Sequence, residues 1–397
     1  MKLDALIIGG GPAGATTALL LAEAGWSVGL IEKKLFPRRK VCGEFLSATN
    51  LPLLEKLGLA DYYLSTGGPE VQRIGLYAAS TILIAPMPPA SSQVKWGRAL
   101  GRELLDTEII NKAQAAGVHL WQPAEAMALQ RKSDQFICSL KKDNEIIEVT
   151  APVVVVANGS WEKRIDAKVN KISKKSDLLA FKAHFKNTSL APDLMPLLAF
   201  PGGYGGLVNT NNQRVTLSCC IRRDTLQDLR RPGLQAAETV CQYIKNQCRG
   251  VSEVLFSAQR EGEWLATGSI QPGVRNCYKD GLFFVGNIAG EAHPIVAEGI
   301  SMAMQSAWLL STFLIKHKSN LLRGKSLNET GAAYTKEWRR QMAKRIYVSA
   351  FFAQLAMMSQ RTSSLILPVI KQFPAILTLG AKLCGKIKQV VPTVENI

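Results

Sequence analysis

The chain has 397 residues, enough for two or three domains at roughly 100–200 residues per domain. Apolar residues make up 47% of it and charged residues 20%, which excludes a disordered chain and a fibre. The 48 Lys and Arg outnumber the 31 Asp and Glu, giving a net charge of +17. Residues 311–397 hold 14 bases and 3 acids, or 14 − 3 = +11, which leaves 34 − 28 = +6 for residues 1–310. A basic excess of this kind concerns partners and solubility, not fold.

The eight cysteines form no CxxC pair and no Cys/His ligand spacing. In a chain of this length we therefore expect reduced thiols in a cytoplasmic protein, with neither a metal site nor a disulfide framework. The apolar stretch after Lys2 carries glycines that a secretory signal does not need, so we expect no signal peptide. No stretch is apolar enough for a confident membrane span of about 18 residues or more.

The first 33 residues predict a strand over 3–8, a helix over 13–24 and a second strand over 27–31. Between the first strand and the helix stands GGGPAG at 9–14, an intact GxGxxG. A glycine-rich turn by itself is weak evidence. The strand, turn, helix, strand and terminal acid in this order predict a dinucleotide-binding fold.

Each residue of this pattern has a mechanical role. Gly9 allows the tight turn, Gly11 lets the backbone approach a pyrophosphate, and Gly14 brings the helix close to the strand. The helix N-terminus faces the phosphates, and Glu32 accepts hydrogen bonds from a ribose. An acid at position 32 disfavours a 2′-phosphate, so the site suits the adenosine ribose of FAD or NAD.

A second glycine-rich element lies far downstream, at residues 281–307. It begins as the strand LFFV, passes a glycine-rich turn and enters a helix near Gly299. A simple NAD dehydrogenase is not expected to carry this second element, which favours FAD.

Four segments resemble one known family: the N-terminal fingerprint, RKVCGEFLS at 39–47, GRELLD at 101–106, and VGNIAG at 285–290 followed by Pro294 and EGI at 298–300. The chain resembles flavoproteins of the geranylgeranyl reductase type, within the p-hydroxybenzoate-hydroxylase-like group of FAD enzymes and flavin-dependent halogenases. The resemblance implies an α/β fold. Its parts are a Rossmann-like FAD-binding domain of the glutathione-reductase-2 type, an antiparallel β substrate domain and a helical C-terminal region.

The expected domain limits follow from these segments. The FAD-binding domain takes 1–70, 98–170 and 273–310, the substrate domain takes an insertion at 71–97 together with 171–272, and the basic helical region takes 311–397. Short strand-like runs in the substrate domain, such as 74–77, 179–185 and 215–221, predict a sheet that covers the flavin.

The resemblance implies a set of residues that bind FAD. Glu32 would hold the adenosine ribose, Arg102 the phosphates and Ala126 the adenine, while residues 286–290 would hold the ribityl chain and diphosphate. Gly299 and Ile300 would present their backbone N–H groups to the N1–O2 edge of the flavin. The whole set is Gly9, Gly11, Pro12, Ala13, Gly14, Glu32, Lys33, Cys42, Gly43, Arg102, Ala126, Gly286, Asn287, Gly299 and Ile300.

Two positions depart from the family's pattern. Its GD motif is Gly286-Asn287 here, and its DG motif is Asn158-Gly159. An asparagine accepts a hydrogen bond through its amide oxygen but brings no charge. The departures therefore keep a third hypothesis open, a flavin-fold binding protein without catalysis.

The candidate catalytic residues are Cys42, Tyr204 and His293. Cys42 would lie beside the flavin, either as a reactive thiol or in a packing role. Tyr204 lies in AFPGGYGGLV at 199–208, which resembles a pocket-facing segment of the family, with Phe200 also facing the pocket, or else is a glycine-rich turn. For His293 a structural role is favoured over proton transfer.

The basic tail predicts helices over 338–358 and 364–388, the second broken at Pro368 and Pro374. It is either a helical cap on the substrate sheet or a basic amphipathic surface that contacts an anionic membrane, and the two are compatible. The protein would then be cytoplasmic and peripheral to the membrane. Nucleic acid is not expected, because aromatic residues are not interleaved with the basic ones.

These observations predict a FAD-dependent oxidoreductase of a small hydrophobic substrate, such as a prenyl, lipid or polyketide chain. NAD(P)H or a carrier would supply the electrons, without a second GxGxxG domain. An aromatic-ring monooxygenase is the enzymatic alternative. Halogenation is disfavoured, because the WxWxIP pattern of halogenases is missing.

Overall fold

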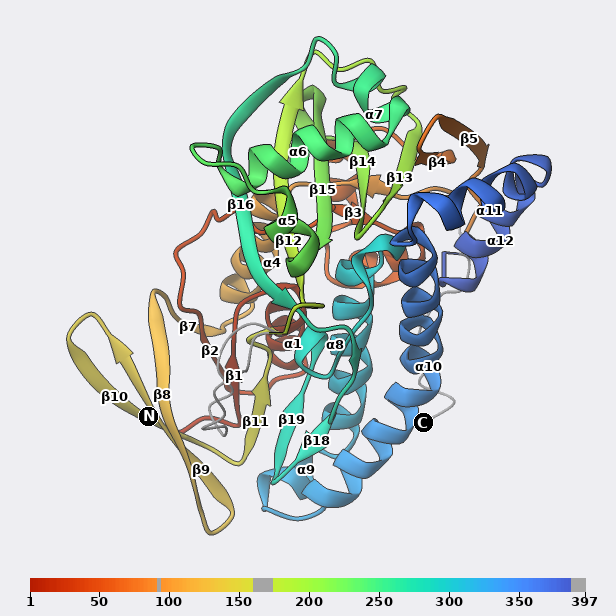
Figure 1. The fold of residues 1–397 in the computed structure, drawn as a ribbon. Helices are drawn as coiled ribbons and strands as arrows, with labels where there is room; N and C mark the ends of the chain where they lie inside the picture. Colours follow the sequence, from red (N-terminus) through yellow and green to blue (C-terminus); the bar gives the residue numbers. More distant parts are fainter. Residues whose placement is uncertain (91–93, 160–173, 387–397) are drawn as a thin grey trace.

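The computed structural model of the chain describes residues 1–90, 94–159 and 174–386, with the side chains of Gln360 and Ser364 left out. Two large sheets form the frame, with helices packed along them (Figure 1). This is the predicted α/β architecture with a helical C-terminal region. The domain limits given above stay a prediction.

The first large sheet has six strands in the order β18-β19-β11-β1-β2-β7, all parallel except β18. The central strands β1, β2 and β11 are buried along their whole length, as expected for parallel strands covered on both faces. Helices α1 (Pro12–Glu23), α4 (Arg102–Ala115) and α8 (Gly299–Lys316) pack beside one another next to this sheet. The strands are β1 (Ala5–Ile8), β2 (Val28–Ile31), β7 (His119–Trp121), β11 (Val153–Val156), β18 (Tyr278–Lys279) and β19 (Leu282–Phe284).

The strand–turn–helix unit at the N-terminus is confirmed. The two strands begin two residues and one residue later than predicted, and the helix has the predicted length but begins and ends one residue earlier. Gly9 has φ +106°, in the region that favours glycine. A Cβ on Gly14 would lie 1.9 Å from the carbonyl oxygen of Gly9. Only glycine therefore permits α1 to start this close to β1.

A three-stranded antiparallel sheet extends from the first one, in the order β10-β9-β8. It is the yellow ribbon at the lower left of Figure 1. Its strands are β8 (Ala124–Lys132), β9 (Gln135–Lys142) and β10 (Glu145–Ala151).

The second large sheet has seven strands in the order β16-β12-β15-β14-β13-β4-β5. Its pairs are antiparallel, except that β13 runs parallel to β4. Helices α5 (Arg223–Leu229), α6 (Ala236–Gln247) and α7 (Arg249–Val254) lie next to it. The strands are β4 (Arg73–Ala78), β5 (Thr81–Pro86), β12 (Leu178–Lys186), β13 (Leu194–Phe200), β14 (Gly203–Thr210), β15 (Arg214–Arg222) and β16 (Gln259–Ile270).

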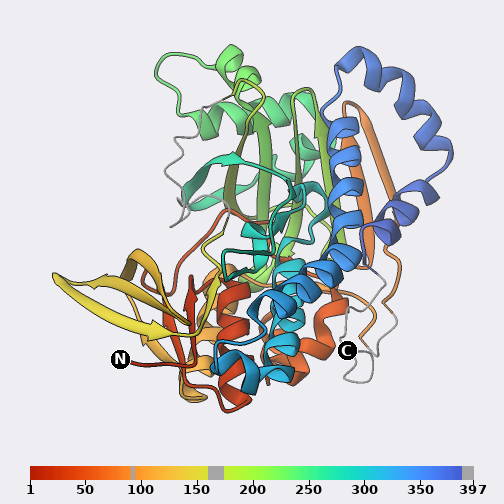
Figure 2. The ribbon, with the colours of Figure 1, turned by 90° about the horizontal axis from the view of Figure 1, so that it is seen from below.

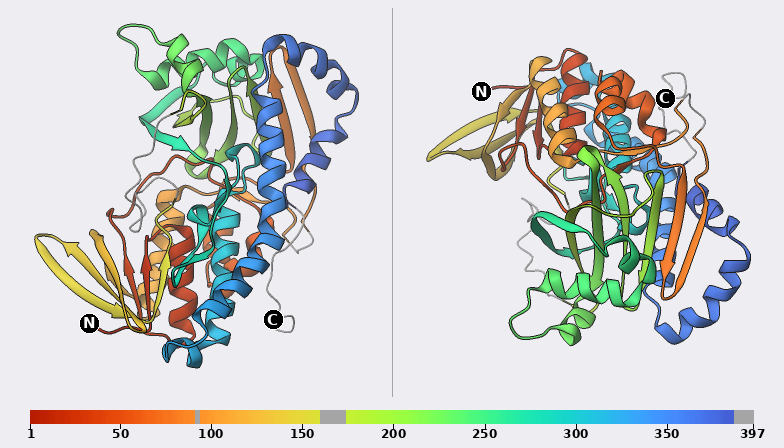
Figure 3. Two further views of the ribbon diagram at one scale, coloured as in Figure 1. Left: turned by 60° about the horizontal axis from the view of Figure 1, so that its bottom comes forward. Right: turned by 90° about the horizontal axis from the view of Figure 1, so that it is seen from above.

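The C-terminal region is helical, as predicted. Figures 2 and 3 show its last helices beside the orange strands β4 and β5, at the edge of the second sheet. Pro368 lies inside α11, so the predicted break there is wrong, whereas the break at Pro374 is confirmed at the start of α12. The helices are α9 (Lys318–Leu322), α10 (Leu327–Ala356), α11 (Gln360–Gln372) and α12 (Ala375–Leu383). The predicted end of the second helix, residues 387–388, lies outside the described residues.

Short elements connect these layers. Two small pairs of strands, β3 with β6 and β17 with β20, lie between the large sheets. The short elements are α2 (Leu51–Lys56), α3 (Ala60–Thr66), β3 (Phe45–Leu46), β6 (Arg98–Ala99), β17 (Gly273–Val274), β20 (Gly290–Glu291) and the 3₁₀ turns at Ala48–Asn50, Asn211–Gln213, Gly286–Ile288 and Pro294–Val296.

Candidate functional site

A cavity of about 680 Å³ lies between the two large sheets. On one side it meets the carboxyl ends of β1, β2 and β11, at Ile8, Ile31 and Ala157. On the other side it meets β14 and β15. The carboxyl ends of parallel strands are where open α/β sheets bind ligands. This cavity, called the main cavity below, is the candidate site.

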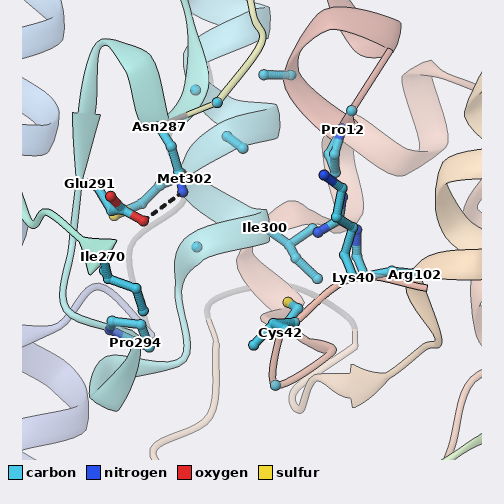
Figure 4. A pocket seen from close by; sticks show the side chains of 18 of the residues that line it. Pro12, Lys40, Cys42, Arg102, Ile270, Asn287, Glu291, Pro294, Ile300 and Met302 are labelled. Carbon is cyan, nitrogen blue, oxygen red and sulfur yellow. Dashed lines mark hydrogen bonds between the residues drawn. The ribbon is translucent and has the colours of Figure 1, made fainter. Parts of the chain in front are cut away.

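The structure brings together most of the residues predicted from the sequence. Figure 4 shows Cys42, Lys40 and Arg102 on one side of the cavity and Asn287 on the other, with Ile300 between them. Gly14 and His293 do not line the cavity. The predicted residues that line it are Gly9, Gly11, Pro12, Ala13, Glu32, Lys33, Cys42, Gly43, Arg102, Ala126, Tyr204, Gly286, Asn287, Gly299 and Ile300.

The cavity wall has room and donors for a dinucleotide. A Cβ built on Gly11, Gly43 or Gly299 would meet no atom within 4 Å, so the backbone is open to a ligand at all three positions. Gly299 also begins the 18-residue helix α8, whose N-terminal N–H groups favour negative charge. The Oδ1 atom of Asn158 is buried without a hydrogen-bond partner among the described residues, and a ligand donor would supply one. The residues present therefore fit FAD.

Glu32 is held in place by three groups of the protein. Its carboxylate accepts hydrogen bonds from the backbone N–H of Gly10 and of Lys34, both at 2.8 Å. Arg38 Nη2 lies 3.3 Å from Oε2. A carboxylate has about four acceptor sites, so this one still has capacity for ribose hydroxyls.

Arg102 lies at the start of α4, between the cavity and a buried acid. Its Nε and Nη2 donate to the two oxygens of Asp106, each at 2.6 Å, and Asp106 is fully buried. Burial opposes the charge of Arg102, but Asp106 and the nearby Cys42 thiol raise its pKa above the ordinary value. The guanidinium is thus fixed and charged. A phosphate would bind through the donors that Asp106 leaves.

Asn287, where the family carries an acid, is hydrogen-bonded to a carboxylate. Its Nδ2 donates to Glu291 Oε1 at 3.0 Å (Figure 4). Glu291 also lines the cavity, is only 5% exposed, and lies 3.5 Å from Arg275 Nη2. The carboxylate of Glu291 is thus hydrogen-bonded to the residue at the position where the family carries its acid.

A buried ionic cluster stands behind the loop that carries Cys42. Glu44 Oε1 pairs with Lys182 Nζ, while His184 Nε2 lies 3.0 Å and Thr216 Oγ1 2.6 Å from Oε2. Burial by itself would raise the pKa of Glu44, but the hydrogen bond from His184 and the Lys182 ammonium hold it well below its ordinary range. Because Lys182 and His184 belong to β12 and Thr216 to β15, the cluster connects the loop to the second large sheet.

The same loop is strained at its end. Glu44 has φ +63°, a left-handed conformation that costs a non-glycine residue of order 1–3 kcal/mol unless its surroundings hold it. The Glu44 carboxylate also accepts the backbone N–H of Arg102 at 3.2 Å. We refer to Glu44, Lys182, His184 and Thr216 as the Glu44 cluster.

Tyr204 and His293 form a neutral pair at the wall of the cavity. The Tyr204 hydroxyl lies 3.0 Å from His293 Nδ1. Burial lowers the pKa of His293 to about 4, so its ring is neutral at pH 7. Burial, together with Cys220, raises the pKa of Tyr204 well above its ordinary value. One proton therefore lies between the two side chains at neutral pH, with Tyr204 on the cavity side.

The expected position of Phe200 is corrected by the structure. Residues 199–208 fold as a hairpin, in which β13 turns at Pro201-Gly202 into β14. Phe200 and Tyr204 therefore occupy different strands. Phe200 lines a second cavity rather than the main one.

This second cavity, of about 190 Å³, lies between β4, β13 and the C-terminal helices. Its lining is almost entirely apolar, with Phe200, Phe352 and Leu367 among the larger side chains. We call it the apolar chamber. Met195, Leu197 and Ile295 line both the chamber and the main cavity, so the two share a wall.

A second buried ion pair lies directly before helix α8. Lys386 Nζ donates to Glu298 Oε1 at 2.6 Å, and the two side chains are 4% and 0% exposed. Lys386 Nζ also lies 4.4 Å from the ring centre of Phe45, next to the Glu44 cluster. The end of the described chain is thus anchored beside Gly299.

Three groups of site residues were missed in the sequence: the partners of Glu44, the pair Glu298 and Lys386, and Glu291. Glu44 and Glu298 lie within the motifs that carry the family resemblance. An acidic residue next to a glycine in such a motif is the signal that could have identified both of them. Their partners lie 138 and 88 residues away in the chain. No local pattern identifies such partners.

Comparison with known proteins agrees with this geometry. A family model described as a FAD binding domain matches residues 2–349. A digeranylgeranylglycerophospholipid reductase of Methanopyrus kandleri is 25% identical over 323 residues, covering 77% of this chain and 78% of the relative. A menaquinone reductase of Mycobacterium tuberculosis is 29% identical over 157 residues, covering 40% of this chain and 38% of the relative. The chain spans 38% to 63% of the length of the first four curated relatives.

Solved structures share the fold. The flavin-dependent brominase Bmp2 matches with a TM-score of 0.79 at 18% identity, covering 97% of this chain and 94% of that one. A geranylgeranyl bacteriochlorophyll reductase-like protein of Thermoplasma acidophilum matches with a TM-score of 0.75 at 20% identity, covering 100% and 99%. The predicted resemblance to geranylgeranyl reductase-type flavoproteins is confirmed.

Proposed function

Because the chain belongs to the FAD binding domain family, we propose that it is a FAD-dependent oxidoreductase whose substrate is an apolar molecule with a long chain. The observation that carries the substrate class is the apolar chamber, which shares Met195, Leu197 and Ile295 with the main cavity. A chain that passes this wall would have one end at the cofactor site and the other among apolar side chains.

The residues around the main cavity have distinct parts in holding FAD. Gly11 and the start of α1 would receive the pyrophosphate, with Arg102 adding a fixed positive charge. Glu32 would accept the ribose hydroxyls, and the N-terminus of α8 at Gly299 would meet the flavin edge where negative charge collects. The chemistry that bound FAD supplies is the transfer of a hydride or of electrons.

The chain's own residues would control water and protons at the site. The two sheets enclose the cavity, and the chamber has few polar groups that could hold water. Tyr204 and His293 keep a proton at Tyr204 Oη or His293 Nδ1, next to the cavity. A neutral pair with a shared proton suits donation to a carbon or oxygen of a substrate that gains electrons.

Relatives support this class of substrate but do not identify the molecule. The names of two relatives specify a digeranylgeranyl phospholipid and a menaquinone, both of which carry polyprenyl chains. The electron donor of this chain would be NAD(P)H or a reduced carrier that binds at the surface of the FAD-binding layer.

The test uses purified protein with its FAD reduced chemically under anaerobic conditions. Polyprenyl quinones and prenyl lipids of increasing chain length are added, flavin reoxidation is followed by absorbance, and products are identified by mass spectrometry. We expect reoxidation that becomes faster with chain length until the chamber is filled. In a parallel assay in air with NAD(P)H, oxygen uptake with a hydroxylated aromatic product would instead support the monooxygenase alternative. Protein that binds no FAD would support the non-catalytic one.

A further inference from the structure

Helices α11 and α12 form an elbow, Gln360–Leu383, with an exposed apolar surface. Sixteen large apolar side chains are exposed among the described residues, and eight of them lie between 347 and 383. Two more, Ile82 and Ile84, lie on β5, against which α12 packs through the hydrogen bond from Thr378 Oγ1 to the Pro86 carbonyl. The eight are Tyr347, Phe351, Leu365, Val369, Phe373, Ile376, Leu379 and Leu383.

The sequence around this surface carries charge of one sign. Residues 338–386 contain eight Lys or Arg and no Asp or Glu, although two of the eight, Arg345 and Lys386, are buried. Arg361, Lys371 and Lys382 lie on the elbow itself and are exposed. An apolar surface bordered by cations is typical of helices that lie in the interface of an anionic membrane.

The shape of the elbow favours lying on a bilayer over crossing it. Within the described ranges, no single helix has the length and hydropathy of a membrane span. α11 and α12 reach that hydropathy only together, and the chain bends by 100° between them. Figures 2 and 3 show the elbow at the outer edge of the molecule, beside β4 and β5.

The elbow also covers the apolar chamber. Leu367 and Ile370 of α11 and Leu377 and Ala381 of α12 line it from the outside. The same two helices therefore have an outer surface exposed to solvent and an inner surface on the chamber. A lipid-soluble molecule would travel only the thickness of the elbow between a bilayer and the chamber.

We propose that the α11–α12 elbow lies in the interface of an anionic bilayer, with Leu365, Val369 and Phe373 among the acyl chains and Lys371 and Lys382 at the lipid headgroups. This lipid contact rests on the exposed side chains and the charge alone. Its use for delivering substrate to the chamber rests on the proposed function. A second copy of the chain is a poorer occupant, because it would bring the same cations against these.

The test is co-sedimentation with vesicles of phosphatidylcholine, with or without phosphatidylglycerol. We expect the protein to sediment with the anionic vesicles, and Phe373→Asp to abolish that binding. Phe256→Asp is the matched control, because Phe256 is 88% exposed but lies just after α7. Equal binding of the wild type and Phe373→Asp, or equal loss in Phe256→Asp, would overturn the proposal.

Charge is tested separately with Lys371→Glu/Lys382→Glu. At about 1 kcal/mol for each lysine near an anionic surface, the double variant should weaken binding to anionic vesicles by at least about tenfold. Lys141→Glu changes an exposed lysine on β9 and should leave binding unchanged.

Sedimentation velocity without lipid tests whether a second copy of the chain covers this surface instead. A dimer that Phe373→Asp dissociates would assign the surface to a second copy and refute the lipid contact. All variants should keep their flavin absorbance, which separates this test from that of the proposed function.

Discussion

Replacing Lys182 by methionine should destabilise the protein strongly, because it removes the main countercharge of Glu44. The side chains of Lys182 and Glu44 are 1% and 0% exposed. Breaking a buried ion pair by removing one partner costs about 3–5 kcal/mol, since the other charge stays buried. A protein with about 5–15 kcal/mol of total stability would lose a large share of it.

The matched control lies on the same strand. Lys186 pairs with Glu261 at 2.6 Å, but the two side chains are 51% and 34% exposed. An exposed pair is worth about 0–1 kcal/mol, so Lys186→Met should change little. The assay is urea unfolding at pH 7, followed by circular dichroism, with the midpoint and slope compared among variants.

A double-mutant cycle isolates the pair. Glu44→Gln combined with Lys182→Met removes both charges, so the double variant should be more stable than the sum of the single losses predicts, by at least about 1.5 kcal/mol. The account of the cluster is refuted if Lys182→Met costs no more than Lys186→Met, or if the two losses are additive.

The pH dependence of the same cluster has a definite sign. The pKa of Glu44 lies below that of an unfolded glutamate, about 4.3. Its stabilisation is therefore complete above that pH and is lost as the pH falls below it. The stability difference between the wild type and Glu44→Gln should be constant from pH 7 to 5 and shrink below about pH 4.

Three further predictions concern the rest of the site. His293 has a pKa of about 4, so the wild type should lose stability as the pH falls from about 6.5 towards 4, and His293→Gln should lose less over that range in thermal melts. Lys386→Met should destabilise by about 3–5 kcal/mol in urea, whereas Lys382→Met, at an exposed position, should stay within about 0.5 kcal/mol. Leu197→Trp should add bulk to the wall that the two cavities share and slow long-chain substrates more than short ones, with Leu197→Met as the control. Equal effects on both chain lengths would contradict the proposal that a substrate chain extends past this wall.

The local part of the fold was predictable from the sequence because its determinants are local. The glycines at 9–14 act through backbone conformation and close approach, which depend on neighbours in the chain. The strands 74–77, 179–185 and 215–221 were found from their apolar runs and lie within β4, β12 and β15. Their order in the sheet, with β4 parallel to β13, was not predictable, since pairing between distant strands leaves no local pattern.

Pro368 shows how tertiary position overrides a local rule. Proline usually ends or kinks a helix, yet here α11 continues through it to Gln372. The ionic clusters of the site escaped prediction for a related reason. Glu44 and Glu298 each stood in a motif, but nothing in the sequence near Lys182 or Lys386 indicates that these lysines are buried.

The residues of the site also fall into two groups, those with a local signal in the sequence and those without one. The residues that we expect to bind FAD stand in short motifs, and those that hold the motifs in place come from elsewhere in the chain. Glu291 is an intermediate case. It lies only four positions after Asn287, and its carboxylate meets the amide that replaces the family's acid.

The central claim is that the main cavity binds FAD against the open backbone at Gly11. The most direct measurement is the FAD content of purified protein, from its flavin absorbance and from extraction with mass spectrometry, in the wild type and two glycine variants. We predict about one FAD per wild-type chain, none in Gly11→Val and a wild-type content in Gly268→Val. A Cβ on Gly268 would also meet no atom within 4 Å, but Gly268 lies on β16 and does not line the cavity. A folded Gly11→Val protein that keeps its FAD, or a wild type that takes up none when FAD is added, would contradict the account.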